Sequence, residues 1–91
     1  MSDYEWDLAK EAENKRKHGI DFSTVERFEW DLATIEFDDR EDYGELREKA
    51  VSFIGDVPHV LVFTRRDDFV RVISLRVATR QERRRYAENR Q

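Results

Sequence analysis

The segment from Phe69 to Tyr86 constrains the fold of this chain more than any other, because a strand pattern runs directly into a helix start. Its first half, residues 69–77, is rich in β-branched and other β-favouring residues, which predicts a strand. Thr79 is followed three residues later by Glu82, and this pair is a capping-box signature for the start of a helix. We therefore expect a strand that passes at once into a capped helix.

Strict alternation along this strand would place one arginine on each of its two faces. Ser74 and Arg76 would share one face with two valines, and Arg71 would lie among apolar residues on the other. A sheet packed on a core should have one apolar face, so these arginines need a ligand or a partner. Since guanidinium binds phosphate in a planar, bidentate manner, the backbone of a nucleic acid is the first ligand to consider.

The charge of the chain is divided between its two parts. Residues 60–91 hold nine Arg, no Lys and four Asp and Glu, a net charge of +5. Residues 1–59 hold eight Lys and Arg against seventeen Asp and Glu, a net charge of −9. This asymmetry indicates a basic surface for polyanions on an acidic body, although charge alone favours an ordinary solvated surface of mixed sign.

The length and composition of the chain limit the number of domains and the kinds of site that it can contain. The 91 residues predict a single domain, spanning 1–91, with a modest core. The absence of cysteine excludes disulfides and thiolate metal sites, and the two histidines are too far apart for a recognisable metal-ligand spacing. We expect no metal and no cofactor. No apolar stretch reads as a signal peptide or a membrane span, so we expect a soluble cytoplasmic protein with no membrane partner.

Two helices are expected before the sheet. Asp7 should cap a helix that runs to His18 and ends at Gly19. This helix is strongly polar, so Trp6 and Phe22 should help to anchor it. Its small apolar set consists of Leu8, Ala9 and Ala12. A second capping box, Ser23 with Glu26, should open a short helix whose inward residues are Val25 and Phe28.

Four strands are expected, near 33–37, 49–54, 59–64 and 69–77. Gly44 can take a positive φ in the acidic turn after the first of them. Because the other connections are short, the strands should be antiparallel. The predicted fold is α+β: a small four-stranded antiparallel sheet with two N-terminal helices and a C-terminal helix.

Several blocks of the sequence resemble the BrnT family, the ribonuclease toxins of bacterial type II toxin–antitoxin pairs. The opening block WD..K...N..KHG..F is carried by Trp6, Asp7, Lys10, Asn14, the run 17–19 and Phe22. Segments 42–47, 60–66 and 71–86 resemble the remaining blocks in the same order. The ordered set covers nearly the whole chain and is specific, above all the arginine-rich closing block. The resemblance implies a RelE-like fold, which agrees with the predicted elements.

The resemblance also implies metal-independent cleavage of single-stranded RNA, which inhibits translation. The ribose 2′-hydroxyl is then the nucleophile, and the site must deprotonate it, protonate the leaving 5′-oxygen and stabilise a phosphorane. The candidates for these catalytic tasks, by motif position, are Arg66, Arg76, Arg80, Tyr86 and His18. The candidates for binding RNA are Lys10, Lys17, Ser74 and Arg83.

The acid–base assignment stays open. His18 is the obvious candidate because imidazole is the usual acid–base group near neutral pH, but it lies at a helix end, where a histidine can interact with terminal carbonyls alone. Glu41 stands where some family members carry a histidine, so one candidate base is missing. Glu45 and Arg47 should pair across a hairpin, and His59 should be a strand-end residue. Trp6, Trp30 and Arg71 are expected to be structural.

The implied partners are RNA and a cognate BrnA-type antitoxin with a DNA-binding domain. The antitoxin should lie across the arginine face and shield Arg76 and Arg80, since covering a basic site with a complementary surface is the simplest inhibition. Promoter DNA would be bound through the antitoxin, in a hetero-oligomer. The alternative is a non-catalytic module that binds nucleic acid or acts as a co-repressor with its partner.

Overall fold

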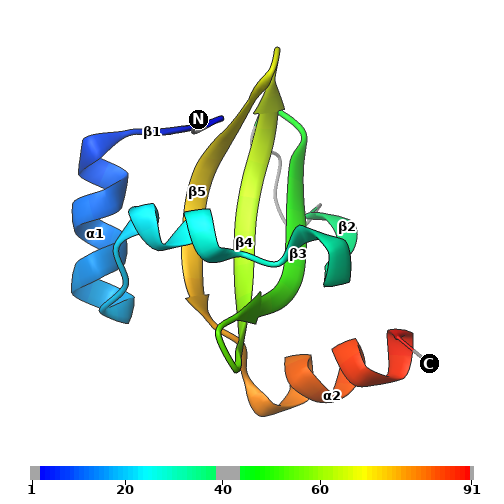
Figure 1. Ribbon diagram of the computed structural model, residues 1–91. Helices are drawn as coiled ribbons and strands as arrows, with labels where there is room; N and C mark the ends of the chain where they lie inside the picture. The colour runs from blue at the N-terminus through cyan, green and yellow to red at the C-terminus, as the bar shows by residue number, and fades with distance from the viewer. Residues whose placement is uncertain (1–2, 39–43, 91) are drawn as a thin grey trace.

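The computed structural model describes residues 3–38 and 44–90, and its centre is a five-stranded sheet (Figure 1). From one edge to the other, the strands are β1 (Tyr4–Trp6), β5 (Phe69–Val77), β4 (Val57–Arg66), β3 (Arg47–Ile54) and β2 (Thr34–Asp38). The four expected strands are all present, and three of them are longer or shifted by a residue or more. The α+β class is confirmed.

The prediction of a purely antiparallel four-stranded sheet is wrong, because β1 adds a fifth strand in parallel to β5. This strand has three residues and ends directly before the N-cap of the next helix, so it is too short to show an alternating pattern. The sheet is therefore mixed, with β2 to β5 antiparallel. The kinship with RelE-like toxins stays a prediction.

A bulge interrupts β5 at Ile73. Ser74 pairs with Val62 on β4, whereas Val72 pairs with Phe63, so the register passes over Ile73. An extra residue of this kind reverses the alternation of side chains for the rest of the strand.

The bulge places both arginines of β5 on the same face of the sheet. Arg71 lies opposite Thr64, and Arg76 lies opposite Val60. Residues opposite each other in an antiparallel pair share a face of the sheet. Thr64 and Val60 are four positions apart on β4, so both lie on the same face, and so do the arginines opposite them. The predicted arginine on each face is therefore wrong. One face of β5 is left apolar, with Leu75 fully buried.

Two 3₁₀ helices, η1 (Phe22–Arg27) and η2 (Trp30–Leu32), cross the apolar face of the sheet (Figure 1). Nine buried residues form the core between them and the sheet: Phe22, Val25, Phe28, Ala50, Ile54, Leu61, Phe63, Val72 and Leu75. The expected inward positions of Val25 and Phe28 are confirmed. Trp30 packs edge-on against Phe28 and Phe63, as expected of a structural tryptophan.

The predicted second capping box is wrong. Ser23 lies inside η1, and Asp21 holds the N-cap position without a side-chain capping bond in the described chain. The expected short helix is present as a 3₁₀ helix of six residues, tightened by its i→i+3 bonds.

The helix α1 (Leu8–His18) begins and ends as expected. The Asp7 carboxylate accepts from the amides of Ala9 (2.9 Å) and Lys10 (3.1 Å), and Gly19 ends the helix with φ 72°. Trp6 packs edge-on against Phe22, which confirms the expected anchor. The small apolar set contributes nothing to the core, because Leu8, Ala9 and Ala12 are all exposed.

The residue that α1 buries is Asn14, whose side-chain amide bonds to the free edge of β5 beyond the end of β1. Its Nδ2 donates to the carbonyl of Leu75 (2.8 Å), and its Oδ1 accepts from the Leu75 amide (3.1 Å). The same Nδ2 donates to the carbonyl of Ile20 (3.1 Å). The asparagine side chain thus takes the place of a residue on a neighbouring strand and satisfies the backbone amide and carbonyl of Leu75 at the edge of the sheet.

The helix α2 (Arg80–Asn89) lies across one end of the other face of the sheet, which we call the α2 face (Figure 1). The expected capping box between Thr79 and Glu82 is confirmed. Tyr86 is the one residue of α2 that is buried; it packs edge-on against Phe53 and donates its hydroxyl to the carbonyl of Leu32 (2.6 Å). The apolar layer beneath this helix consists of Val51, Val60, Val62 and Ala78.

The bonds of Asn14 generate a stability prediction. Asn14→Ala would leave both polar groups of Leu75 without the side chain that satisfies them, and we expect the free energy of unfolding to fall by about 3 kcal/mol. Urea unfolding followed by circular dichroism would measure this. Asn89→Ala, at the exposed end of α2, should change stability by less than about 0.5 kcal/mol. Equal stability of both variants would show that Asn14 does not secure the edge.

Candidate functional site

The register of the sheet brings polar residues together on the α2 face. Ser74 on β5 and Lys49 on β3 both lie opposite Val62 on β4, so the three form one row across the sheet. Ser74 and Lys49 are therefore two strand spacings apart, a backbone distance of about 10 Å. Arg76 lies in the next row, opposite Val60, and so shares the face with Ser74.

A hollow of 160 Å³ lies between α1 and β5, and it borders this row. It is lined by Lys10, Glu13, Asn14, Lys17, His18, Ile73 and Ser74. Four of these are residues that the sequence predicted for the site from two distant segments: Lys10, Lys17, His18 and Ser74. The bonds from Asn14 to β5 hold α1 where its side chains can face the strand.

The charges in this hollow are mostly cationic. Lys17 pairs with Glu13 (2.8 Å), and that contact holds the pKa of the exposed Glu13 carboxyl below its usual range. Lys10 and His18 make no ion pair or hydrogen bond in the described parts of the chain through their side chains. Two cations, the His18 imidazole and the Ser74 hydroxyl therefore line a space that can admit a phosphate group.

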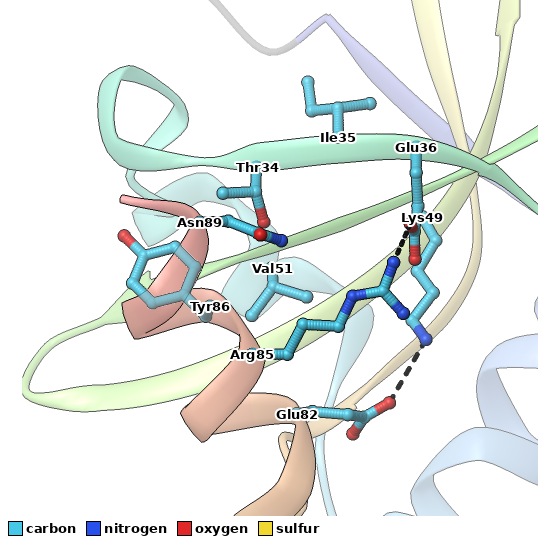
Figure 2. A pocket seen from close by; sticks show the side chains of 9 residues that line it. All are labelled: Thr34, Ile35, Glu36, Lys49, Val51, Glu82, Arg85, Tyr86 and Asn89. Atoms are coloured by element: carbon cyan, nitrogen blue, oxygen red, sulfur yellow. Dashed lines mark hydrogen bonds and ion pairs between the residues drawn. The ribbon is translucent and has the colours of Figure 1, made fainter. Parts of the chain in front are cut away.

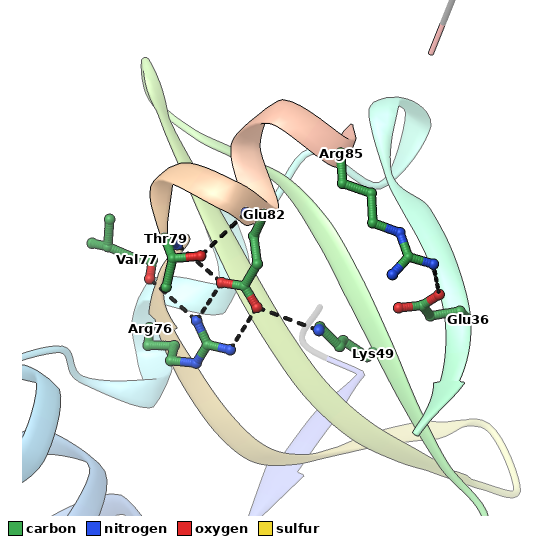
Figure 3. A network of polar contacts seen from close by, with 7 residues as sticks. All are labelled: Glu36, Lys49, Arg76, Val77, Thr79, Glu82 and Arg85. Carbon is green, nitrogen blue, oxygen red and sulfur yellow. Dashed lines mark hydrogen bonds and ion pairs between the residues drawn. The ribbon is translucent and has the colours of Figure 1, made fainter. Parts of the chain in front are cut away.

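A second polar cluster joins α2 to the sheet (Figure 3). The Arg76 guanidinium donates to the Glu82 carboxylate through Nη1 (2.7 Å) and Nη2 (2.8 Å), in bidentate geometry. Lys49 Nζ lies 3.3 Å from the same carboxylate, and the Thr79 amide donates to it at 2.9 Å. Two cations thus contact the same carboxylate. We call Lys49, Arg76 and Glu82 the cation cluster.

Glu82 is ionised in this setting. The hydrogen bonds from Arg76 hold its pKa far below the ordinary value of 4.5, and the Thr79 amide and Lys49 act in the same direction against the effect of burial. A carboxylate with so low a pKa does not take up a proton near neutral pH. Its role is to hold the two cations, and general acid–base catalysis needs another group.

A smaller hollow of 70 Å³ lies beside the cation cluster, between α2, β2 and β3 (Figure 2). Arg85 pairs with Glu36 across it (3.1 Å), and Lys49 reaches Glu82 at its border. Tyr86 forms part of its wall but is only 8% exposed. The catalytic role expected for Tyr86 does not fit this position, because its ring packs against Phe53 and its hydroxyl donates a hydrogen bond to the carbonyl of Leu32.

The structure separates the remaining predicted arginines. Arg80 and Arg83 are exposed on α2, on the side of the molecule where the cation cluster lies. Arg66 ends β4, six residues beyond the position opposite Arg76, and a strand of that length spans about 20 Å. The sequence-based grouping of Arg66 with the other arginines in one site is therefore wrong.

Other predicted residues are structural. Arg47 pairs with Glu45 as expected (3.3 Å), although the two are neighbours at the start of β3 and do not face each other across a hairpin. Arg71 lies 3.7 Å from Glu5, as expected of an ion-pair partner. His59 is buried, with Nδ1 2.8 Å from the carbonyl of Val57. Glu41 lies outside the residues that the structure describes, so the question of its replacement of a histidine stays open.

Sequence reasoning missed Lys49 and gave Glu82 only a capping role. Lys49 belongs to no sequence motif and was seen only as part of a predicted strand. The register that places it opposite Val62 cannot be predicted from the sequence. Glu82 carried a signal that could have been extended, because a capping-box carboxylate next to an arginine-rich strand has a cation within reach. Within 3–38 and 44–90, no three His, Asp or Glu side chains are grouped to hold a metal ion.

The comparisons with known proteins identify the family. The model of the family described as "Ribonuclease toxin, BrnT, of type II toxin-antitoxin system" matches residues 6–82. The chain belongs to the BrnT family. The match includes the hollow and the cation cluster, and it ends before Arg83 and Tyr86.

A solved structure agrees with this assignment to the BrnT family. The Brucella abortus ribonuclease toxin, BrnT, superposes with a TM-score of 0.69 at 25% sequence identity, over 88% of this chain and 100% of that chain. No curated protein matches the chain at a significant level. The family carries ribonuclease toxins of type II systems, so an antitoxin partner belongs with this chain. No helix in the described part is long and apolar enough to cross a membrane.

The cation cluster generates a prediction about pH. Because the pKa of Glu82 is lowered on folding, its ionised form stabilises the fold above about pH 4.5, and this stabilisation is lost as the pH falls below that value. We expect Glu82→Gln to cost about 1 kcal/mol at pH 7, after allowance for solvent screening, and less at pH 3. Thermal unfolding at several pH values would measure this. Glu88→Gln, at the exposed end of α2, is the control, and an equal loss at both pH values for Glu82→Gln would contradict the account.

Proposed function

We propose that this chain is a metal-independent endoribonuclease toxin that cleaves single-stranded RNA in the bacterial cytoplasm and thereby inhibits translation. The observation that carries the proposal is the hollow between α1 and β5. It brings Lys10, Lys17, His18 and Ser74 together beside the cation cluster, in a chain of the ribonuclease toxin family. We further propose that its fold is related to that of the RelE-like toxins.

The proposed reaction uses the RNA as its own nucleophile. The 2′-oxygen attacks the adjacent phosphorus, the bond from phosphorus to the 5′-oxygen breaks, and a 2′,3′-cyclic phosphate and a 5′-hydroxyl are formed. His18 is the acid–base group in this proposal, since an imidazole exchanges protons near neutral pH. It lies exposed in the same hollow as the Ser74 hydroxyl, which would orient the phosphate.

The cations would act on the charge of the phosphate. Lys10 and Lys17 would hold the phosphates that flank the cleaved bond, as two positive charges along one wall of the hollow. Arg76 lies two residues along β5 from Ser74 and would stabilise the phosphorane together with Arg80 at the start of α2. Arg83 would contact the RNA farther along α2.

The antitoxin would act by covering this surface. A BrnA-type partner with its own DNA-binding domain would lie across Arg76 and Arg80 and present a complementary surface to the basic face. It would carry the complex to promoter DNA in a hetero-oligomer. A chain that only binds nucleic acid or acts as a co-repressor is the competing interpretation, and the cleavage assay decides between them.

We expect the purified chain, freed of antitoxin, to cleave single-stranded RNA in the presence of EDTA. His18→Gln should lower the rate by about a hundredfold or more, because it removes the proton-transfer group while keeping a polar side chain. Cleavage of an end-labelled oligonucleotide would measure the rate and show the cyclic phosphate end.

Lys15→Ala is the matched control for this assay. Lys15 lies on the same helix but pairs with Asp21 (3.1 Å) outside the hollow, so its removal should leave the rate unchanged. A His18→Gln variant that cleaves at the parental rate would rule out the acid–base role of His18. A parent chain that binds RNA without cleaving it would support the non-catalytic interpretation instead.

Hydrogen exchange of the toxin–antitoxin complex tests the proposed inhibition. We expect slowed exchange in the amides of 74–83, because a partner across the basic face would protect the end of β5 and the start of α2. Protection confined to β2 and the first helix, with 74–83 unchanged in an inactive complex, would refute direct occlusion.

A further inference from the structure

We propose that Lys49 is a phosphate-binding residue of the RNA site and that Glu82 is the positioning residue that holds Lys49 and Arg76 for this task. The inference rests on the proposed ribonuclease function and adds a residue from β3 to a site otherwise built from α1, β5 and α2. The contacts of one carboxylate carry it (Figure 3).

Glu82 fixes both cations from one point. Its Oε1 accepts from Arg76 Nη1 and from the Thr79 amide, and its Oε2 accepts from Arg76 Nη2 and lies next to Lys49 Nζ. The bond from Thr79 ties the carboxylate to the first turn of α2, so its direction is set by the backbone. Two flexible cationic side chains are therefore held in place before any RNA arrives.

Such preorganisation favours binding of a phosphate. A lysine and an arginine are held on the same carboxylate, and Glu82 remains ionised because of these contacts. Donors that are already oriented lose little freedom when the phosphorane forms, so they stabilise it more than mobile donors would. The same carboxylate could instead compete with RNA for the arginine, and the two possibilities predict opposite effects on the rate.

Lys49 lies where RNA that extends from the hollow across the α2 face would pass. It lies in one row with Ser74, about 10 Å away across β4, on the α2 face. Its ammonium group has three N–H donors. Within the described part of the chain, Glu82 is its ion-pair partner. The side chain is 23% exposed, so a phosphate can approach it from solvent.

Binding of a non-cleavable RNA isolates the role of Lys49. The probe is a single-stranded oligonucleotide with 2′-fluoro groups in place of its 2′-hydroxyls. We expect Lys49→Met to weaken binding and to reduce the slope of log affinity against log salt by about 0.7, the value for the loss of one phosphate contact on a single strand. Lys49→Arg should restore the slope.

Arg85→Met is the matched control, because Arg85 is also a cation paired with a carboxylate, in the neighbouring hollow. Its removal should leave the slope unchanged. A lysine that only secures α2 to the sheet would lower the melting temperature without changing the salt dependence, so an unchanged slope in Lys49→Met overturns the proposal.

Steady-state cleavage by Glu82→Gln tests the positioning role. Glutamine can still complete the capping box, so the helix start is preserved while the charge is removed. We expect kcat to fall about tenfold while KM stays the same or falls, because the cations remain but are no longer fixed. An increase in kcat would show that Glu82 masks Arg76, and equal kcat would show that it has no role in positioning; either result overturns the inference.

The failure of this inference is distinct from failure of the proposed function. A parent chain that cleaves RNA while Lys49→Met behaves as the parent does would overturn the role of Lys49 alone. A parent chain that neither binds the fluorinated RNA nor cleaves natural RNA would overturn both.

Discussion

The paired hydrogen bonds between Asn14 and Leu75 are the contact on which the rest of this structure depends. They close the edge of β5 where β1 ends, and they do so with a side chain from a helix that buries no apolar residue. A helix as polar as α1 has little hydrophobic reason to lie against the sheet. These bonds, with the Trp6 contact before the helix, keep it there, and they thereby create the hollow that holds His18 and Ser74.

The bulge at Ile73 supplies the second constraint. Without it, Arg76 would face the apolar core, where an unpaired charge is costly. With it, Arg76 turns to the α2 face and meets Glu82, while Leu75 completes the core on the opposite side. One extra residue in a strand therefore separates an apolar face from a cationic face and attaches α2 to the sheet through an ion pair.

Local signals in the sequence predicted the helix ends and four strands well. The Asp7 cap, the Gly19 stop and the Thr79 capping box depend on neighbouring residues, so their chemistry can be read directly. The predictions of the strand number and of the two arginine faces failed because contacts between distant residues determine them. β1 is too short to show a pattern, and the bulge depends on how β5 pairs with β4. The site was predicted in part for the same reason. Motif positions named His18 and Ser74, but only the register across three strands brings Lys49 to them.

The central claim is that RNA binds on the α2 face, between α1 and α2. Amide chemical shifts of ¹⁵N-labelled protein, titrated with the fluorinated single-stranded oligonucleotide, test it most directly. The account predicts the largest changes in 10–18, in 73–80 and at Lys49, which are far apart in the sequence and adjacent in the fold. Changes confined to the turn at 66–69, at the opposite end of β4 and β5, would contradict it.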